Sequence, residues 1–398
     1  MEIGLVGKPN VGKSTFFEAA TLAGVEIANY PFTTIHANRG MGYLRCPDPG
    51  EDLGVESKPK NSIVIDGTRY VPVELLDVAG LVPDAHSGKG LGNQFLDDLR
   101  QAHALVHIID VSGSTDSEGN PVDTGKHDPV QDVDFLEREI DFWFNGIIQR
   151  DWQKMSRTSE SIKGPIERML GEKLTGLGIT VHHIHDAMVH QGLDTGHPTR
   201  WTEEDMFQLA TTLRKVSKPM MIAANKADRA TDDQLASLES SSGGMIVIPT
   251  CSEAEMALKK ASKAGLIQYK PGDPDFTITD PSKLNIAQTK ALEKIRGVLH
   301  RFGSTNVQTV MEKAAYELLD LIVVFPVEDE HKFTDKDGNV IPDAHLLRRG
   351  STARDLAYKV HTDLGDHFIR AIDCRTQRTI GHDHELKHGD VIKIHSNA

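Results

Sequence analysis

The sequence has few cysteines, no long apolar run and no excess of positive charge. Its 398 residues include only Cys46, Cys251 and Cys374, which are too dispersed for a disulfide framework or a paired-cysteine zinc site. No apolar run approaches the ~20 residues of a membrane span, and Met1 leads directly into an apolar segment, so neither a membrane partner nor a signal peptide is expected. The net charge of −14 argues against general coating of nucleic acid but allows local basic patches. We expect a cytoplasmic protein.

The segment GLVGKPNVGKSTF, Gly4–Phe16, combines the end of an apolar strand, a glycine-rich turn and the start of a helix. Its spacing matches G-x-x-x-x-G-K-[ST], in which backbone amides and a helix N-terminus surround a phosphate. Lys13 would neutralise the β and γ oxygens, and the Ser14 hydroxyl would bind Mg²⁺. The predicted nucleotide-binding residues here are Lys8, Pro9, Asn10, Val11, Gly12, Lys13, Ser14 and Thr15.

Two further motifs follow apolar segments in the expected order. In LLDVAG, Asp77 at the end of an apolar strand is a candidate Mg²⁺ ligand, and Gly80 lets its amide approach a γ-phosphate. In NKAD, the Asp228 carboxylate can accept from the guanine N1–H and 2-amino group, neither of which adenine offers. Asn225 can either reach the purine edge or brace the phosphate loop, and the Lys226 stem can cover the base.

Apolar periodicity changes along the chain and predicts its domains. We expect an α/β P-loop domain, with a mostly parallel sheet and helices on both faces, from residues 1–125 and 216–260. A helical insertion is expected over 126–215, where an apolar helix face begins after Gln131 and Gly164-Pro165 and His197-Pro198 break the pattern. We expect residues 261–319 to be a helical continuation of the P-loop domain and residues 320–398 to form a small α+β domain. The three tryptophans fall in the insertion, where packing is the favoured interpretation.

Taken together, these segments resemble an Obg-related, translation-factor-class P-loop GTPase of the YchF branch in its archaeal-type form. The resemblance is carried by GKPNVGKST at 7–15, NYPFTT at 29–34, DVAGLVPDAHSGKGLGNQFL at 77–96 and NKAD at 225–228. It implies that Thr33 or Thr34, preferably Thr34, closes over Mg²⁺ and the γ-phosphate. It also implies that Cys251 and Ser252 occupy the base-contact loop. Many YchF proteins lack the final aspartate of NKxD and are similar to ATPases, so Asp228 favours guanine.

The sequence lacks the glutamine that usually orients water for GTP hydrolysis. Where Ras-like enzymes carry a water-orienting glutamine this chain has Leu81, so a slow intrinsic rate is expected. Asn10 matches relatives that bind K⁺ at the phosphate loop, which makes K⁺ a candidate second cofactor beside Mg²⁺. His86, in the segment after Asp77, is a candidate to reach the water, although an ordinary solvated histidine is the simpler interpretation. A large partner that reorders the switch loops is the third candidate.

The C-terminal residues 321–398 resemble a TGS domain, a β-grasp module, through LLRRGSTARDLAYKVHTDLGDHFIRAID and the ending LKHGDVIKIH. A local basic run there could contact RNA phosphates, and its candidates are Arg348, Arg349, Arg354 and Lys359, with His345 beside them. A solvated surface is the alternative. Thr352-x-x-Asp355 predicts the start of a helix in this domain. The resemblance suggests a ribosome or RNA partner.

The sequence therefore predicts a monomeric GTP- and GDP-binding switch that hydrolyses GTP with Mg²⁺. Two alternatives stay open: a nucleotide-gated sensor with negligible turnover, and an ATPase of the YchF type. A metal site among His182, His183, His185 and His190 is disfavoured, because no paired ligands accompany them.

Overall fold

The computed structural model describes residues 1–21, 39–78 and 92–397. The chain divides into two compact units, which are treated separately below. The first unit joins Met1–Phe17 to Leu75–Ala254, and the second joins Glu18–Glu74 to Glu255–Ala398. Within the described ranges, none of the helices combines the length and apolar character needed to cross a bilayer.

The first unit is built on a parallel sheet whose strands run in the order β1-β5-β6-β7. Residues Ala104–Asp110 and Met220–Asn225 form β5 and β6, which are buried along their whole length, as the continuous apolar runs predicted. The strands β1 and β7 span Glu2–Val6 and Val247–Thr250. The last residues of β4 (Thr68–Asp77) lie next to β1. The expected α/β sheet is confirmed.

Helices follow these strands in the chain. Their bounds are Lys13–Ala20 for α1, Gly92–Gln101 for α3, Asp232–Ser240 for α9 and Ser252–Lys263 for α10. Short 3-10 turns occur at Thr175–Leu177, Pro198–Arg200, Ala227–Arg229 and Pro281–Lys283.

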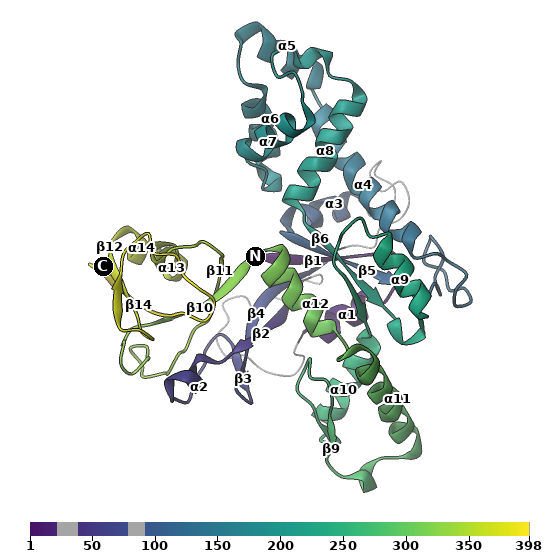
Figure 1. Ribbon diagram of the computed structural model, residues 1–398, viewed down its shortest axis with the longest axis vertical. Helices are drawn as coiled ribbons and strands as arrows, with labels where there is room; N and C mark the ends of the chain where they lie inside the picture. Colours follow the sequence, from purple (N-terminus) through teal and green to yellow (C-terminus); the bar gives the residue numbers. More distant parts are fainter. Residues whose placement is uncertain (22–38, 79–91, 398) are drawn as a thin grey trace. The chain divides into compact units, whose positions relative to one another are not determined.

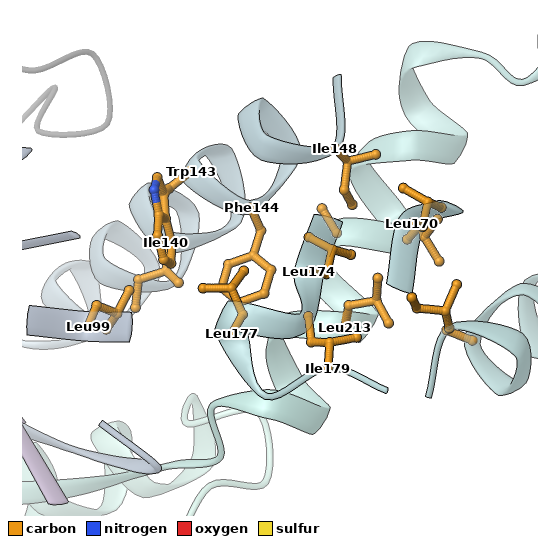
Figure 2. Packing of buried hydrophobic residues seen from close by; sticks show 14 of the residues in the cluster. Leu99, Ile140, Trp143, Phe144, Ile148, Leu170, Leu174, Leu177, Ile179 and Leu213 are labelled. Carbon is orange, nitrogen blue, oxygen red and sulfur yellow. The ribbon is translucent and has the colours of Figure 1, made fainter. Parts of the chain in front are cut away.

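Between β5 and β6 stands a group of helices whose tips lie away from the sheet (Figure 1). They are α4 (Val130–Gln149), α5 (Trp152–Ile162), α6 (Ile166–Leu174), α7 (Val181–Gln191) and α8 (Glu203–Ser217). Figure 2 shows Phe144 and Ile148 of α4 meeting Leu170 and Leu174 of α6 in a common core. Trp152 and Trp201 stack with ring centroids 5.1 Å apart, which confirms packing as the role of this pair.

Local sequence explains where α7, α8 and α9 begin. Thr180, Thr202 and Thr231 each form a capping box, in which the hydroxyl accepts from the third helical residue and that residue's side chain returns the bond. In α7 the returning group is the imidazole of His183, which gives this histidine a structural role. The helix α4 differs, because Pro129 precedes it and supplies no side-chain cap.

The second unit contains two groups of elements. The first comprises β2 (Arg39–Pro47), α2 (Pro49–Leu53), β3 (Ile63–Ile65), most of β4, the hairpin β8–β9 (Ile267–Gln268 and Thr277–Ile278), α11 (Ile286–Phe302), α12 (Val307–Lys313) and the π-helix Ala314–Leu318. The sequence predicted a mostly helical segment over 261–319 and did not predict the hairpin β8–β9, because two-residue strands are too short to show a period.

The second group is a five-stranded sheet in the order β11-β10-β14-β12-β13. Its strands are β10 (Leu321–Val327), β11 (His345–Arg348), β12 (Phe368–Asp373), β13 (Arg378–Ile380) and β14 (Val391–Ser396), with helices α13 (Ala353–Val360) and α14 (Thr362–Asp366). Thr352 and Asp355 form a complete capping box at the start of α13, as predicted. Leu356 of α13 packs on Ile322 and Val324 of β10.

A buried arginine joins these two groups of the second unit. Arg69 of β4 is fully buried; its Nε donates to Ser62 Oγ at 2.7 Å and its Nη1 to Asp48 Oδ1 at 3.2 Å. Its Nη2 donates to the carbonyl of Ile341 at 2.7 Å, and the guanidinium lies 5.4 Å from the centroid of the Phe325 ring. The contacts with Ile341 and Phe325 thus fix the C-terminal group to the β2–β4 segment, while those with Ser62 and Asp48 hold the guanidinium within that segment.

Replacing Arg69 by methionine should destabilise the protein by about 3–5 kcal/mol, because Asp48 would stay buried without its partner. Arg375→Met is the matched control: its ion pair with Asp52, at 3.0 Å, joins side chains that are 30% and 69% exposed, and its loss should cost less than about 1 kcal/mol. Urea unfolding monitored by circular dichroism measures both. Equal losses in the two variants would contradict the assigned importance of Arg69.

Candidate phosphate-binding site

Four polar segments follow the carboxyl ends of the parallel strands in the first unit. They are 7–15 after β1, 110–115 after β5, 225–228 after β6 and 251–252 after β7. In open parallel sheets, ligands bind at this edge. The register places Asp110 beside Asn225 and Asn225 beside Thr250, so three of the segments begin at one level.

The phosphate loop turns sharply at Gly12 and is braced there by Asn225. Gly12 has φ +94°, which only glycine adopts readily, and a Cβ at this position would lie 2.3 Å from Asn225 Nδ2. That amide nitrogen donates to the carbonyl of Val11 at 2.9 Å, while Oδ1 accepts from the Ser252 backbone at 3.2 Å and from its hydroxyl at 2.9 Å. The sequence left two roles open for Asn225, contact with the purine edge and bracing of the phosphate loop. In the structure its side chain braces the loop.

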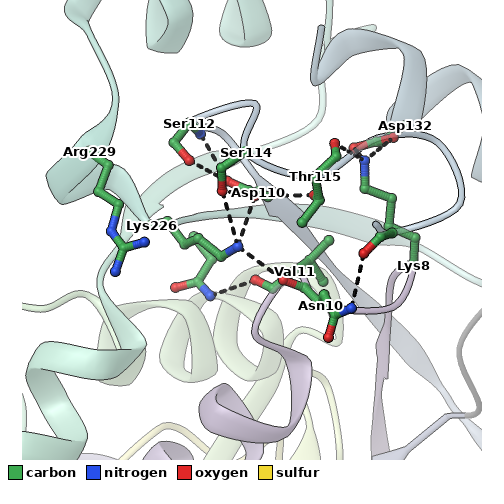
Figure 3. A network of polar contacts seen from close by, with 12 residues as sticks. Lys8, Asn10, Val11, Asp110, Ser112, Ser114, Thr115, Asp132, Lys226 and Arg229 are labelled. Carbon is green, nitrogen blue, oxygen red and sulfur yellow. Dashed lines mark hydrogen bonds and ion pairs between the residues drawn. The ribbon is translucent and has the colours of Figure 1, made fainter. Parts of the chain in front are cut away.

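Lys226 makes a second brace (Figure 3). Its ammonium donates to the carbonyl of Asn10 at 3.0 Å and to Asp110 Oδ2 at 2.8 Å. Asp228 follows in the short turn Ala227–Arg229, with its side chain 16% exposed and Oδ2 3.9 Å from Arg229 Nε. Cys251 is buried beside this region, at the end of β7.

Lys13 and Asp77 are brought together. The Lys13 ammonium forms an ion pair with the Asp77 carboxylate and also donates to the carbonyl of Val78 at 2.6 Å. Ser14 follows at the start of α1 and is exposed. The two charged groups predicted to serve phosphate and metal therefore neutralise each other in this structure.

The sequence analysis missed Asp110, which organises the loop after β5. It is fully buried and accepts from Ser112 Oγ at 2.6 Å, Ser114 Oγ at 2.7 Å and Lys226. Burial would raise the pKa of Asp110, but these hydrogen bonds outweigh it and hold the pKa below its usual value. An aspartate ending an apolar strand was the signal used for Asp77, and the same signal in ALVHIID could have identified Asp110.

Lys8 and Asn10 turn their side chains toward the same loop. Lys8 is 4% exposed, and its ammonium contacts Asp132 and the carbonyl of Thr115. Asn10 Nδ2 donates to the carbonyl of Gly119 at 3.0 Å. These residues were expected to bind nucleotide, and their side-chain donors are engaged within the protein, which leaves the backbone amides and Asn10 Oδ1.

Several predicted residues lie outside the described ranges. They are Thr33, Thr34, Gly80, Leu81 and His86. Pro9 and Thr15 are in the phosphate loop and at the start of α1 as expected.

The candidate RNA contacts of the β-grasp sheet divide into two kinds. All four are exposed, but Arg349 pairs with Asp320 at 2.7 Å and Arg354 donates to the carbonyl of Gly365 at 3.2 Å. Burial lowers the pKa of His345 to about 4, so its imidazole is neutral at pH 7 and adds no charge to the run.

This strand order, with a braced phosphate loop and an NKxD segment at the same sheet edge, defines a P-loop nucleotide-binding protein. Three family models match the chain: "50S ribosome-binding GTPase" over residues 2–137, "Obg-like GTPase YGR210-like, G4 motif-containing domain" over 223–329, and "TGS domain" over 331–396.

Individual relatives agree with these matches. A GTP-binding protein of Methanocaldococcus jannaschii is 53% identical over 397 residues, covering 100% of this chain and 99% of its own length. The ribosome-binding ATPase YchF of Haemophilus ducreyi is 27% identical and covers 92% and 86%. The crystal structure of a GTP-binding protein from Pyrococcus horikoshii superimposes with a TM-score of 0.78 at 43% identity and 100% coverage of both chains. The chain belongs to the Obg-related, YchF-type family of GTP-binding proteins and carries a C-terminal TGS domain.

A buried histidine lies close to the phosphate loop. His107 of β5 is 2% exposed, and its Nδ1 has no hydrogen-bond partner in the described part of the chain. Burial, with the positive charge of Lys8 as a smaller cause, lowers the pKa of His107 to about 3. The folded protein therefore keeps this ring neutral where an unfolded chain would protonate it.

His107 should make the protein acid-sensitive. Below a pH of about 6.5, the usual pKa of histidine, the unfolded chain binds a proton at His107. The folded chain binds this proton only near pH 3, so the free energy of unfolding falls as the pH falls between these values. Relative to wild type, His107→Leu should gain roughly 2 kcal/mol between pH 7 and pH 5. Urea unfolding at each pH measures the difference, which should stay constant between pH 7 and pH 8. A constant difference down to pH 5 would contradict this assignment.

Proposed function

We propose that the protein is a guanine-nucleotide switch that binds GTP with Mg²⁺, hydrolyses it to GDP and phosphate, and acts on ribosomes or RNA in the cytoplasm. The observation that carries the proposal is the bracing of the phosphate loop by the NKAD segment. Asn225 and Lys226 hold the carbonyls of Val11 and Asn10, so the loop for phosphate and the carboxylate of Asp228 belong to one rigid arrangement. A site built this way reads both ends of one nucleotide.

Base choice rests on Asp228. Its carboxylate can accept two hydrogen bonds from guanine, whereas adenine would present a lone pair to it and leave it unpaired. Cys251 and Ser252 would line the same pocket, with Ser252 holding the Asn225 amide in orientation. The relative from H. ducreyi is named an ATPase, which keeps adenine binding as the alternative to be tested.

The residues present suit a magnesium ion. Ser14 and Asp77 offer a hydroxyl and a carboxylate, which are the hard oxygen donors that Mg²⁺ prefers. Gly12 leaves the loop backbone open where a Cβ would collide with Asn225. When bound, the ion would neutralise charge on the β- and γ-phosphates. Thr34 would complete the ligand set, and Lys13 would exchange its contact with Asp77 for phosphate oxygens.

Replacing Asp228 by alanine should lower GDP affinity about 100-fold, the effect of losing roughly 3 kcal/mol of charge-assisted hydrogen bonds. ADP affinity should barely change, so the preference for guanine should disappear. Calorimetric titration of nucleotide-free protein with GDP and ADP measures both. Asp233→Asn, an exposed acidic residue in α9, is the control and should bind as wild type. Tighter binding of ADP than GDP by wild type would overturn guanine specificity.

Hydrolysis would use the phosphate loop and a cation in place of the missing glutamine. Asn10 Nδ2 is engaged by Gly119, which fixes the amide and leaves Oδ1, the atom a cation would need. Gly80 would contribute its backbone amide and Lys13 its charge, and His86 is the further candidate for contacting water. A sensor with negligible turnover is the second candidate function, favoured by Leu81.

GTP turnover should be slow in NaCl and at least several-fold faster in KCl, because K⁺ at Asn10 would add positive charge beside the transferred phosphoryl group. Phosphate release under multiple-turnover conditions, with and without ribosomes, is the measurement. Equal rates in the two salts would reject the K⁺ role. If hydrolysis is undetectable in both salts and with ribosomes present, the sensor function is the correct one.

A role on ribosomes or RNA is supported by the TGS match and by the H. ducreyi relative, which is named a ribosome-binding ATPase. Arg348 and Lys359 are the exposed cations of the β-grasp sheet best suited to phosphate contacts, with Arg349 and Arg354 nearby. We expect this protein to act as a monomer.

A further inference from the structure

The phosphate loop is tied to the helical insertion by a buried ion pair that its nucleotide chemistry does not require. Lys8 Nζ donates to Asp132 Oδ1 at 2.9 Å, and Oδ2 lies 2.8 Å away outside hydrogen-bond geometry, so it contributes by charge alone. Both side chains are less than 10% exposed. His127 Nε2 approaches the same Oδ1 at 2.8 Å, which fixes the carboxylate from the other side. Screening by water is therefore small, and the pair is strongly held.

The rest of the contact is made by the loop between β5 and α4 (residues 111–129). Asp110 holds the start of this loop through Ser112, Ser114 and Thr115. The loop then presents the carbonyls of Thr115 to Lys8 and of Gly119 to Asn10. Gly119 has φ +87°, and a Cβ there would lie 2.6 Å from the carbonyl oxygen of Pro9, so backbone meets backbone. The loop 111–129 thus supports the phosphate loop through these contacts (Figure 3).

Asp132 stands in the first turn of α4, and α4 is a helix of 20 residues, about 30 Å long. Farther along the same helix, Phe144 and Ile148 are buried in the core of the insertion. A helix that is packed along its length moves as one body, so a displacement at the insertion reaches Asp132.

The second connection of the insertion also ends at the nucleotide site. The helix α8 is locked to α4 by Arg214, whose guanidinium is 3% exposed and donates to Asp141 at 2.8 Å and Glu137 at 2.9 Å. After α8 the chain enters β6, whose last residue is Asn225. The insertion therefore joins the phosphate loop through Asp132 and the base-recognition segment through β6.

We propose that Asp132 is a positioning residue for the phosphate loop and that, through the Lys8–Asp132 pair, the helical insertion controls how long the diphosphate stays bound. A partner that shifts α4 withdraws the carboxylate from Lys8, loosens the loop at residues 8–11 and releases GDP. The inference rests on the proposed function and assigns its nucleotide exchange to the insertion.

The test compares dissociation of fluorescent mant-GDP from full-length variants by stopped flow. Asp132→Asn keeps the shape and one hydrogen bond but removes the charge, and should release mant-GDP at least tenfold faster. Lys8→Met should do the same, and the double variant should be no faster than Lys8→Met, since one interaction is removed in each case. Asp134→Asn, an exposed neighbour in the same turn, is the control and should match wild type.

Two readouts separate positioning from a general loss of structure. GMP lacks the β-phosphate, so its affinity for Asp132→Asn should fall less than threefold while that of GDP falls tenfold. Hydrogen exchange over residues 133–148 should slow when GDP binds wild type, because coupling between sites is reciprocal, and this response should disappear in Asp132→Asn.

The proposal would be overturned if Asp132→Asn released mant-GDP at the wild-type rate, even if the variant were less stable to heat. It would also be overturned if GDP binding left hydrogen exchange over residues 133–148 of wild type unchanged. If Asp132→Asn does not fold, the test uses mant-GDP release from Lys8→Met and the effect of GDP on hydrogen exchange in wild type. Failure of wild type to bind GDP at all would instead remove the proposed function itself.

Discussion

The nucleotide site depends on one constraint: the phosphate loop is held by side chains that lie outside it. The carbonyls of Asn10 and Val11 are fixed by Lys226 and Asn225, and the loop packs on a turn organised by the buried Asp110. A backbone cradle gains its strength from donors that are already oriented when the anion arrives. The surrounding strands β5 and β6 supply that orientation, since their buried, in-register ends carry the bracing residues.

The NKAD segment and the helical insertion of the first unit both relate to this phosphate loop. The NKAD segment stiffens the phosphate loop through Asn225 and Lys226, and in the proposed function its Asp228 reads the base. The insertion helices run from Val130 to Ser217, between Asp110 and Asn225 in the chain, and their core is made of other residues, such as Phe144 and Leu170. A domain inserted between β5 and β6 therefore adds mass beside the nucleotide without interrupting the sheet.

Much of this could be predicted from the sequence, for identifiable reasons. Continuous apolar runs gave the parallel strands, and the helix face beginning after Gln131 gave α4, because burial on both faces or on one stripe leaves a period that can be read. Motif spacing selected Lys13, Asp77 and Asp228 as candidate site residues, and their roles stay predictions. The partners of Lys8 could not be predicted, since Asp132 lies 124 residues away and nothing in its local pattern distinguishes it from other acidic residues at the start of a helix. Arg69 was missed because a charged residue in a strand usually faces solvent, and its burial is compensated by carbonyls far along the chain.

Arg69 also has a consequence for the order in which the polypeptide is completed during synthesis. The carbonyl of Ile341 that accepts its hydrogen bond lies 272 residues downstream. While those residues are still being added, the guanidinium has Ser62 and Asp48 as partners but lacks both the Ile341 carbonyl and the Phe325 ring. The contacts of Arg69 are therefore complete only when nearly the whole chain has emerged, whereas every residue of the first unit has been made by Ala254.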